Sequence, residues 1–176
     1  MPPRILLEGR PGVGKTTVLA RLVERLRAAG ISVAGFTTEE LRERGRRVGF
    51  SVRQVGGGRA VLAHVDLPGP PRVGRYGVDL ASFERLALPS LEWPADVVAI
   101  DELGKMELAS PTFMDAVQVL FDGDRSLVAT VHAFRHPYTD ALKRRPDIVL
   151  VRVTERNRDA LPEELAARLR DALHQP

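Results

Sequence analysis

One short segment near the N-terminus constrains the fold of this chain more than any other. Residues 9–16 read GRPGVGKT and fit the spacing G-x-x-x-x-G-K-[ST] at every fixed position. The apolar run at 5–7 precedes the segment, and apolar residues at helical spacing follow it as far as Gly30. A strand before the turn and a helix after it are the context in which this spacing binds phosphate. We therefore expect a phosphate loop rather than a glycine-rich turn that binds nothing.

The residue types of the loop suit this chemistry. Gly9, Gly12 and Gly14 let the backbone turn tightly and point its N–H groups at phosphate oxygens, and the following helix N-terminus adds partial positive charge. Lys15 can contact the β- and γ-phosphates, and the Thr16 hydroxyl can bind Mg²⁺. The predicted nucleotide-binding residues are Gly9, Arg10, Pro11, Gly12, Val13, Gly14, Lys15, Thr16 and Thr17.

A second chemical centre follows the apolar run at 97–100. Asp101 and Glu102 come directly after this run, at the end of a predicted buried strand where ligands bind in open α/β sheets. With a phosphate loop in the same chain, Asp101 is expected to hold Mg²⁺ as the Walker B residue. A carboxylate at Glu102 can act as general base or position the water that attacks the γ-phosphate. This arrangement favours hydrolysis over nucleotide binding alone.

The remaining pattern predicts an α/β fold with a mostly parallel central sheet flanked by helices. We expect further strands at 31–36, 95–100, 126–131 and 147–153, and helices that begin after Asp79, at Pro111 and at Pro162, the first of them ending at Pro89. At about 46–66, two apolar runs flank Gly56–Gly58, which predicts an inserted β-hairpin. The segment 67–77 is rich in proline and glycine and is expected to be a loop.

Length and composition narrow the class of protein. The chain has 176 residues, and we expect 1–176 to form a single nucleotide-binding domain. It has no cysteine, which excludes disulfides and thiolate metal sites. No apolar run approaches the ~18 residues that a membrane span requires, and no signal-peptide pattern is present. We therefore expect a cytoplasmic protein with no membrane partner. We also expect a monomer rather than an oligomer.

Other polar residues are candidates for the site. Phosphoryl transfer spreads charge over the equatorial oxygens, so a stabilising arginine is expected; Arg47, in the predicted hairpin, is our choice, although a partner chain could supply one instead. Thr130 and His132 end a predicted strand and can contact the γ-phosphate or the water, or His132 can be an ordinary histidine at the rim. Asn157 lies in a polar segment after the last strand, a position that often borders the base.

Several segments together resemble the small nucleoside-triphosphatase family first described from thermophiles, whose human relative is the cancer-related nucleoside-triphosphatase. The most specific are the Gly-Phe-Thr-x-Glu segment at 35–39 and the string IDELGKME at 100–107. The resemblance implies a RecA-like P-loop NTPase fold and slow, Mg²⁺-dependent hydrolysis of ATP, GTP and other triphosphates to diphosphate and phosphate. By position, Lys15 and Thr16 then bind phosphate and Mg²⁺, Asp101 serves the metal and Glu102 activates water. The resemblance assigns no role to Lys105 or Glu107. The segment 134–138 does not match the family pattern, so the resemblance assigns no role to His132 or Arg135 either.

Two other functions fit the same loop. A kinase would transfer the γ-phosphoryl to a small molecule or nucleic-acid end, and phosphate release would then depend on the acceptor. A nucleotide-dependent switch would use the arginine-rich segment 42–59 to contact nucleic acid, and its binding would be sensitive to salt. The net charge of +3 is too small to argue for nucleic acid by itself.

Overall fold

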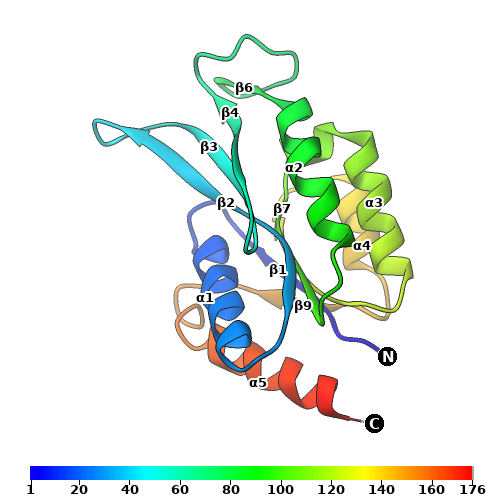
Figure 1. The fold of residues 1–176 in the computed structure, drawn as a ribbon. Coiled ribbons are helices and arrows are strands. Elements are labelled where there is room, and N and C mark those ends of the chain that lie inside the picture. The colour runs from blue at the N-terminus through cyan, green and yellow to red at the C-terminus, as the bar shows by residue number, and fades with distance from the viewer. Residues whose placement is uncertain (176) are drawn as a thin grey trace.

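The computed structural model describes residues 1–175, which form one nine-stranded sheet with helices on both faces (Figure 1). The strand order is β5-β6-β4-β3-β2-β7-β8-β1-β9. The strands are β1 (Arg4–Gly9), β2 (Val33–Glu43), β3 (Arg46–Gln54), β4 (Arg59–His64), β5 (Arg72–Val73), β6 (Tyr76–Val78), β7 (Val97–Leu103), β8 (Ser126–His132) and β9 (Val149–Arg152). The helices are α1 (Lys15–Ala28), α2 (Leu80–Glu92), α3 (Pro111–Asp122), α4 (Pro137–Lys143) and α5 (Leu161–His174), with a 3₁₀ turn at Glu107–Ala109.

The centre of the sheet is parallel, as the sequence predicts. Strand β1 pairs in parallel with β8 on one side and β9 on the other, and β7 pairs in parallel with β8 and with the first part of β2. The strands β1, β7 and β8 are apolar and buried over most of their length, which is typical of a parallel sheet covered on both faces. All of these strands end at the same edge of the sheet, where the phosphate loop begins.

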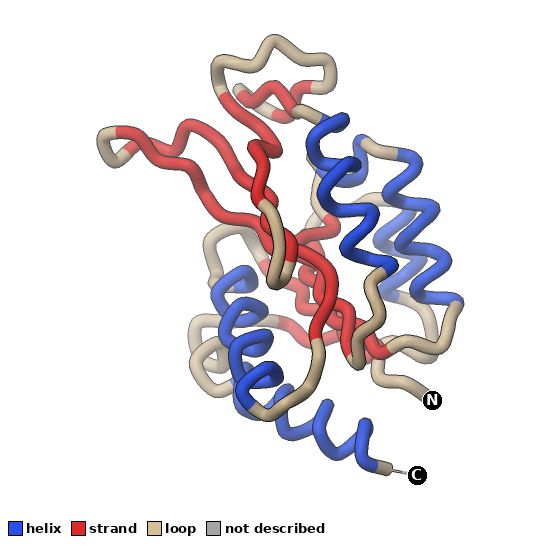
Figure 2. Tube along the Cα trace, in the orientation of Figure 1, coloured by secondary structure: helices blue, strands red, loops and turns tan. Residues whose placement is uncertain are grey.

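Two hydrophobic cores hold the helices on the sheet. Helices α1 and α5 pack together on one face, and α2, α3 and α4 cover the other (Figures 1 and 2). On the second face Phe36, Phe83 and Phe113 meet edge to face, with ring centroids 5.1–5.8 Å apart. Aromatic pairs in this geometry stabilise a core beyond the area they bury. None of the helices within 1–175 has both the length and the apolar character needed to cross a membrane.

The antiparallel part of the sheet is larger than predicted. The hairpin of β3 and β4 is confirmed, but β2 does not end at Phe36: it continues to Glu43 and pairs antiparallel with β3. The extension is polar because most of it lies in an exposed ribbon rather than beneath helices. The segment 67–77, predicted as a loop, contains the short strand β5 and part of β6.

The boundaries of α2 differ from the prediction at one end only. The side chain of Asp79 caps the N-terminus by accepting a hydrogen bond from the Ser82 backbone N–H, as expected. The helix passes through Pro89 and ends at Glu92. A proline in the last turns removes one backbone hydrogen bond, and the buried side chain of Leu91 holds the following turn on the core.

Candidate active site

The phosphate loop lies between β1, which ends at Gly9, and α1, which begins at Lys15. Gly12 and Gly14 have φ angles of 79° and 116°, in the left-handed region that favours glycine. With Gly14 at the N-cap, the loop leads directly into the first turn of α1, where free backbone N–H groups and the helix dipole attract anions. The local geometry predicted for a phosphate loop is therefore present.

Lys15 connects this loop with the end of β7. Its ammonium donates to the carbonyl oxygens of Gly9 at 2.6 Å and Val131 at 3.3 Å, and lies 3.3 Å from Oε2 of Glu102. The Lys15 side chain is only 8% exposed, so its charge is held close to the loop. The structure thus brings together two residues, 87 positions apart in sequence, that we predicted to act on the same γ-phosphate.

Asp101 is buried at the centre of a network of three threonines. Its Oδ1 accepts hydrogen bonds from Thr16 Oγ1 at 3.2 Å and Thr130 Oγ1 at 2.6 Å. Its Oδ2 accepts from the backbone N–H and the hydroxyl of Thr38, at 3.4 and 3.3 Å. Burial raises the pKa of the Asp101 carboxyl, and these hydrogen bonds act in the opposite direction.

Strand order explains how the threonines reach Asp101. The strand β7 that carries Asp101 lies between β2, which carries Thr38, and β8, which carries Thr130. Thr38 was missed by the sequence analysis; its only signal is a polar residue at the point where β2 leaves the buried centre of the sheet. Thr130, one of the two groups considered for contact with the γ-phosphate or the water, instead holds the carboxylate of Asp101.

The pair of Thr16 and Asp101 fits a magnesium ion. Both supply hard oxygen ligands, and the hydroxyl and carboxylate oxygens lie 3.2 Å apart. Within 1–175 there is no cluster of three or more histidine or acidic side chains able to hold a metal by itself. Mg²⁺ in phosphoryl-transfer sites typically has one or two protein ligands, with water and phosphate oxygens completing its shell, so two protein ligands are sufficient.

Glu102 is positioned by its neighbours on the turn after β7. Its side chain is 32% exposed, and its carboxylate folds back over Gly104. Glu107 follows in the 3₁₀ turn and is buried beside it. Burial first, and then the charge of Glu102, raise the pKa of the Glu107 carboxyl well above its usual range. Neither Gly104 nor Glu107 was assigned a role from the sequence, although both belong to the string at 100–107.

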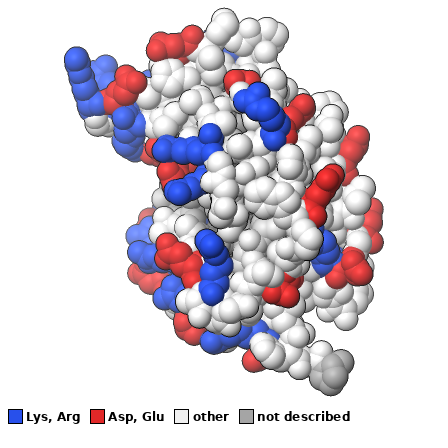
Figure 3. All heavy atoms as spheres, viewed as in Figure 1, with Lys and Arg blue, Asp and Glu red and all other residues white. Residues whose placement is uncertain are grey.

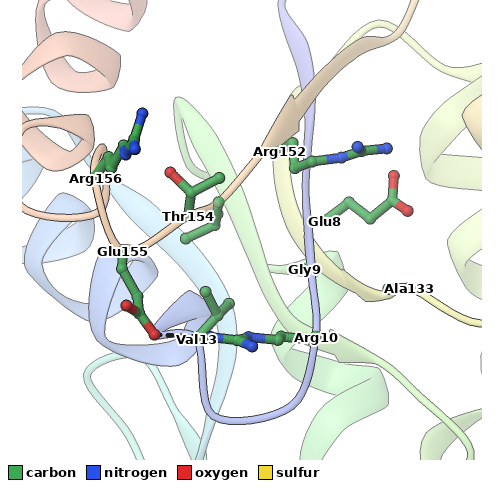
Figure 4. Close-up of a pocket in the computed structure, with 10 residues that line it drawn as sticks. Glu8, Gly9, Arg10, Val13, Ala133, Arg152, Thr154, Glu155 and Arg156 are labelled. Atoms are coloured by element: carbon green, nitrogen blue, oxygen red, sulfur yellow. Dashed lines mark hydrogen bonds and ion pairs between the residues drawn. The ribbon is translucent and has the colours of Figure 1, made fainter.

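Two hollows border the phosphate loop. The larger, of about 610 Å³, lies between the loop and the segment after β9; Arg10 points across it to Glu155, with which it pairs at 2.7 Å (Figure 4). The smaller, of about 320 Å³, lies beside Thr17, at the first turn of α1. It is lined by Gly12, Gly14, Thr17, Val18, Arg21, Arg158 and Asp159.

The segment after β9 contributes Arg158 to the smaller hollow. Its guanidinium donates to the carbonyl oxygen of Val13 at 3.1 Å, and its Cδ lies 3.3 Å from the place where a Cβ of Gly14 would be. Asn157, the residue predicted here, accepts from the backbone N–H of Thr154 and donates to the carbonyl of Arg152, both at 2.8 Å. Its amide therefore holds the turn together, and Arg158, which the sequence analysis did not select, contacts the loop.

Two other candidates have contacts outside the loop. Arg47 donates to the Tyr76 hydroxyl at 3.0 Å and to Glu40 at 3.1 Å, on the antiparallel part of the sheet.

His132 is buried, stacks on Phe134 with ring centroids 3.7 Å apart and pairs through Nε2 with Thr139 at 3.0 Å. Burial, with the nearby charge of Lys143, lowers the pKa of His132 to about 4. The imidazole is therefore a neutral, packed group rather than a histidine at the rim.

Comparison with known proteins agrees with this geometry. The model of the NTPase family matches residues 4–166. The nucleoside-triphosphatase THEP1 of Thermotoga sp. (strain RQ2) is 42% identical over 170 residues, which cover 95% of each chain. The crystal structure of THEP1 from the hyperthermophile Aquifex aeolicus superimposes with a TM-score of 0.84 at 37% identity, covering 94% of this chain and 98% of that one. The solution structure of a human cancer-related nucleoside triphosphatase gives 0.83 at 38% identity, covering 96% and 98%. The predicted P-loop NTPase fold is confirmed.

Proposed function

Because the chain belongs to the NTPase family, we propose that this nucleoside-triphosphatase hydrolyses ATP, GTP and other nucleoside triphosphates to diphosphate and phosphate, slowly and with Mg²⁺. The observation that carries the proposal is the contact of Lys15 with Glu102 at 3.3 Å, next to the contact of Thr16 with Asp101 at 3.2 Å. A phosphate-binding cation, a candidate water-activating carboxylate and a metal-binding pair thus converge at one edge of the sheet.

Each residue has a defined task in this proposal. The loop from Gly9 to Thr17 binds the triphosphate through backbone N–H groups, and Lys15 neutralises the β- and γ-phosphates. Thr16 and Asp101 would hold Mg²⁺, which when bound neutralises charge on the phosphate oxygens. Glu102 orients a water in line with the γ-phosphorus and accepts its proton. Its partial exposure leaves room for that water.

The smaller hollow supports broad base specificity. The backbone N–H of Thr17, at the first turn of α1, is where an α-phosphate is expected, so the nucleoside continues toward Arg21 and Arg158. A guanidinium can stack on any base, because every base has a π-face. The charged side chains here are long and partly exposed, and such groups select weakly among base edges. We therefore expect similar rates for purine and pyrimidine triphosphates.

Lys15 is the cation closest to the candidate base, and Arg47 is bound elsewhere. To reach a γ-phosphate, Arg47 would have to leave Tyr76 and Glu40, whose charge and hydrogen bonds favour the present position. We therefore propose a role for Arg47 only on the condition that it leaves these two partners. A test is the substitution Arg47→Ala: a loss of turnover with unchanged KM would support the role, and unchanged turnover would remove Arg47 from the mechanism.

The function is tested by phosphate release from ATP, GTP, CTP and UTP with Mg²⁺, for the wild type beside Glu102→Gln. We expect slow release from all four and a loss of roughly 10²-fold or more in the variant, the usual scale for a general base, while nucleotide binding persists. Lys15→Ala should weaken triphosphate binding as well. Near wild-type turnover of Glu102→Gln would contradict its role. Tight binding without release would instead favour a kinase that requires an acceptor.

A further inference from the structure

The hairpin of β2 and β3 extends away from the body of the protein (Figures 1 and 2). Its two strands pair from Phe36 with Gln54 to Glu43 with Arg46, and a two-residue turn of Arg44 and Gly45 joins them. The residues of its tip, 42–47, read RERGRR and are all exposed. The base of the hairpin belongs to the core through Phe36 and Val52, but no residue of the tip contributes to either core, so the side chains of the tip are free to serve a different purpose.

The positive charge of the protein is concentrated in the part of the chain that contains this hairpin. Residues 33–78 hold eight arginines and four acidic residues, whereas the rest holds 18 basic and 19 acidic residues. The net charge of +3 therefore comes from +4 in this part and −1 in the remainder. Basic side chains are conspicuous at the end of the hairpin in the space-filling view (Figure 3). A charge that is uneven in this way attracts anions to one place on the surface.

Two arginines at the tip are not neutralised by neighbours. Glu40 pairs with Arg42 at 2.7 Å and with Arg47 at 3.1 Å. In contrast, the side chains of Arg44 and Arg46 make no ion pair or hydrogen bond with any other residue of the described chain. Both guanidinium groups are therefore exposed at the tip of the hairpin without an acidic partner.

The turn itself is unusual. Arg44 has a φ of 48° and Gly45 a φ of 76°, as a two-residue turn of type I′ requires. Asparagine, aspartate or glycine usually takes the first of these positions, and few other residues adopt the left-handed region. An arginine at this position is therefore not explained by the needs of the turn. A ligand that binds its guanidinium would explain it.

We propose that the tip of the β2–β3 hairpin binds the phosphate backbone of a nucleic acid. Guanidinium groups match phosphate oxygens in a bidentate geometry, and sequence-independent binding comes mainly from such contacts. The tip has no aromatic side chain on which a base could stack and no apolar side chain that could enter a lipid bilayer. The chemistry of the tip therefore favours contacts with phosphate alone, without preference for sequence.

The test is the affinity of the full chain for a labelled single-stranded oligonucleotide of about 20 nucleotides, measured at several salt concentrations. Neutralising one phosphate on a single strand contributes a slope of about −0.7 to the dependence of log K on log salt. The double variant Arg44→Asn/Arg46→Ser preserves the turn, because asparagine tolerates a positive φ. It should reduce the slope by about 1.4 and weaken binding at least about tenfold at low salt.

Matched variants distinguish the effect of the tip on binding from the effect of overall charge. Arg27→Ser/Arg85→Ser removes the same charge from exposed positions on α1 and α2 and should retain the wild-type slope. Arg44→Lys/Arg46→Lys should retain most of the binding. The proposal is overturned if the tip variant binds the oligonucleotide as the wild type does. It is also overturned if no oligonucleotide binds and light scattering shows a wild-type dimer that only the tip variant loses. Triphosphate hydrolysis without oligonucleotide should be unchanged in all variants, which separates this proposal from the enzymatic one.

Discussion

Gly104 lies against the carboxylate of Glu102, in the space that a side chain at Gly104 would occupy. A Cβ there would stand 2.6 Å from Oε1 and 2.9 Å from Cγ of Glu102. These separations are shorter than non-bonded contacts allow, so a side chain at Gly104 would displace Glu102. The small size of this residue, rather than its backbone freedom, is what the site requires. The position of the candidate base is therefore set by a residue that carries no functional group.

The substitution Gly104→Ala is accordingly expected to reduce turnover by about tenfold to a hundredfold, the scale of a misplaced catalytic group. Binding of Mg²⁺–nucleotide should change little, because the phosphate loop is untouched. Phosphate release and nucleotide affinity, measured on the same preparation, check this. Gly58→Ala is a suitable control, since a Cβ there would have only ordinary contacts. Equal turnover in the two variants would contradict the steric argument.

Thr130→Val should weaken the metal site without changing its ligands. The variant preserves the shape of the side chain but removes the 2.6 Å hydrogen bond to Oδ1 of Asp101. We expect the Mg²⁺ concentration for half-maximal phosphate release to rise severalfold. We also expect the free energy of unfolding to fall by about 1–3 kcal/mol, the cost of leaving a buried acceptor with one partner fewer. A Mg²⁺ titration and urea unfolding measure the two effects; an unchanged Mg²⁺ requirement would mean that Thr130 is structural only.

Arg158→Ala should raise the KM of all four triphosphates by a similar factor, between about threefold and thirtyfold. The Cδ of Arg158 lies over Gly14 and its guanidinium binds the carbonyl of Val13, at the predicted nucleoside side of the loop, and a cation stacked on a ring is worth about 0.5–2 kcal/mol. Steady-state kinetics with ATP, GTP, CTP and UTP check the prediction. The neighbouring variant Arg156→Ala alters the larger hollow instead and should leave KM unchanged. If Arg156→Ala has the larger effect, the nucleoside lies in the larger hollow.

The buried imidazole of His132 should make stability depend on pH. Its pKa is lowered to about 4 in the folded protein and is about 6.5 in an unfolded chain. Between these values the unfolded state binds more protons, so the free energy of unfolding falls as pH falls through this window and the contribution is fully lost below about pH 4. From pH 7 to pH 5 the loss is about 2 kcal/mol.

Urea unfolding at pH 7 and pH 5 measures this effect in the wild type and in His132→Gln, which does not titrate. The change between the two pH values should be smaller by about 2 kcal/mol in the variant. Only the difference between wild type and variant is diagnostic, because the raised pKa of Glu107 adds a pH dependence of opposite sign to the stability of both proteins. An identical pH dependence in the two would show that His132 is solvated or protonated in the fold.

The sequence by itself determined the parts of the protein that depend on neighbouring residues. The phosphate loop is nine consecutive positions, from Gly9 at the end of β1 to Thr17 in the first turn of α1, and its φ angles and helix start follow from glycine and lysine at fixed spacing. The cap at Asp79 is equally local, since its side chain accepts from the backbone N–H of Ser82 three residues ahead. The apolar runs determined which strands are buried. These features involve residues that are close together in sequence, so pattern and propensity are sufficient to predict them.

Only the tertiary structure decided which distant residues meet. Thr38 and Thr130 hold Asp101 because β2 and β8 flank β7, and no periodicity in the sequence specifies that order. The same holds for Arg158, which reaches Val13 through the turn after β9, and for Arg47, which Tyr76 and Glu40 hold on the hairpin. His132 was predicted near the γ-phosphate or at the rim, but burial against Phe134 and Thr139 made it a packing residue. The physical reason is common to all: the direction of a polar side chain depends on the strands and helices packed around it, and these come from elsewhere in the chain.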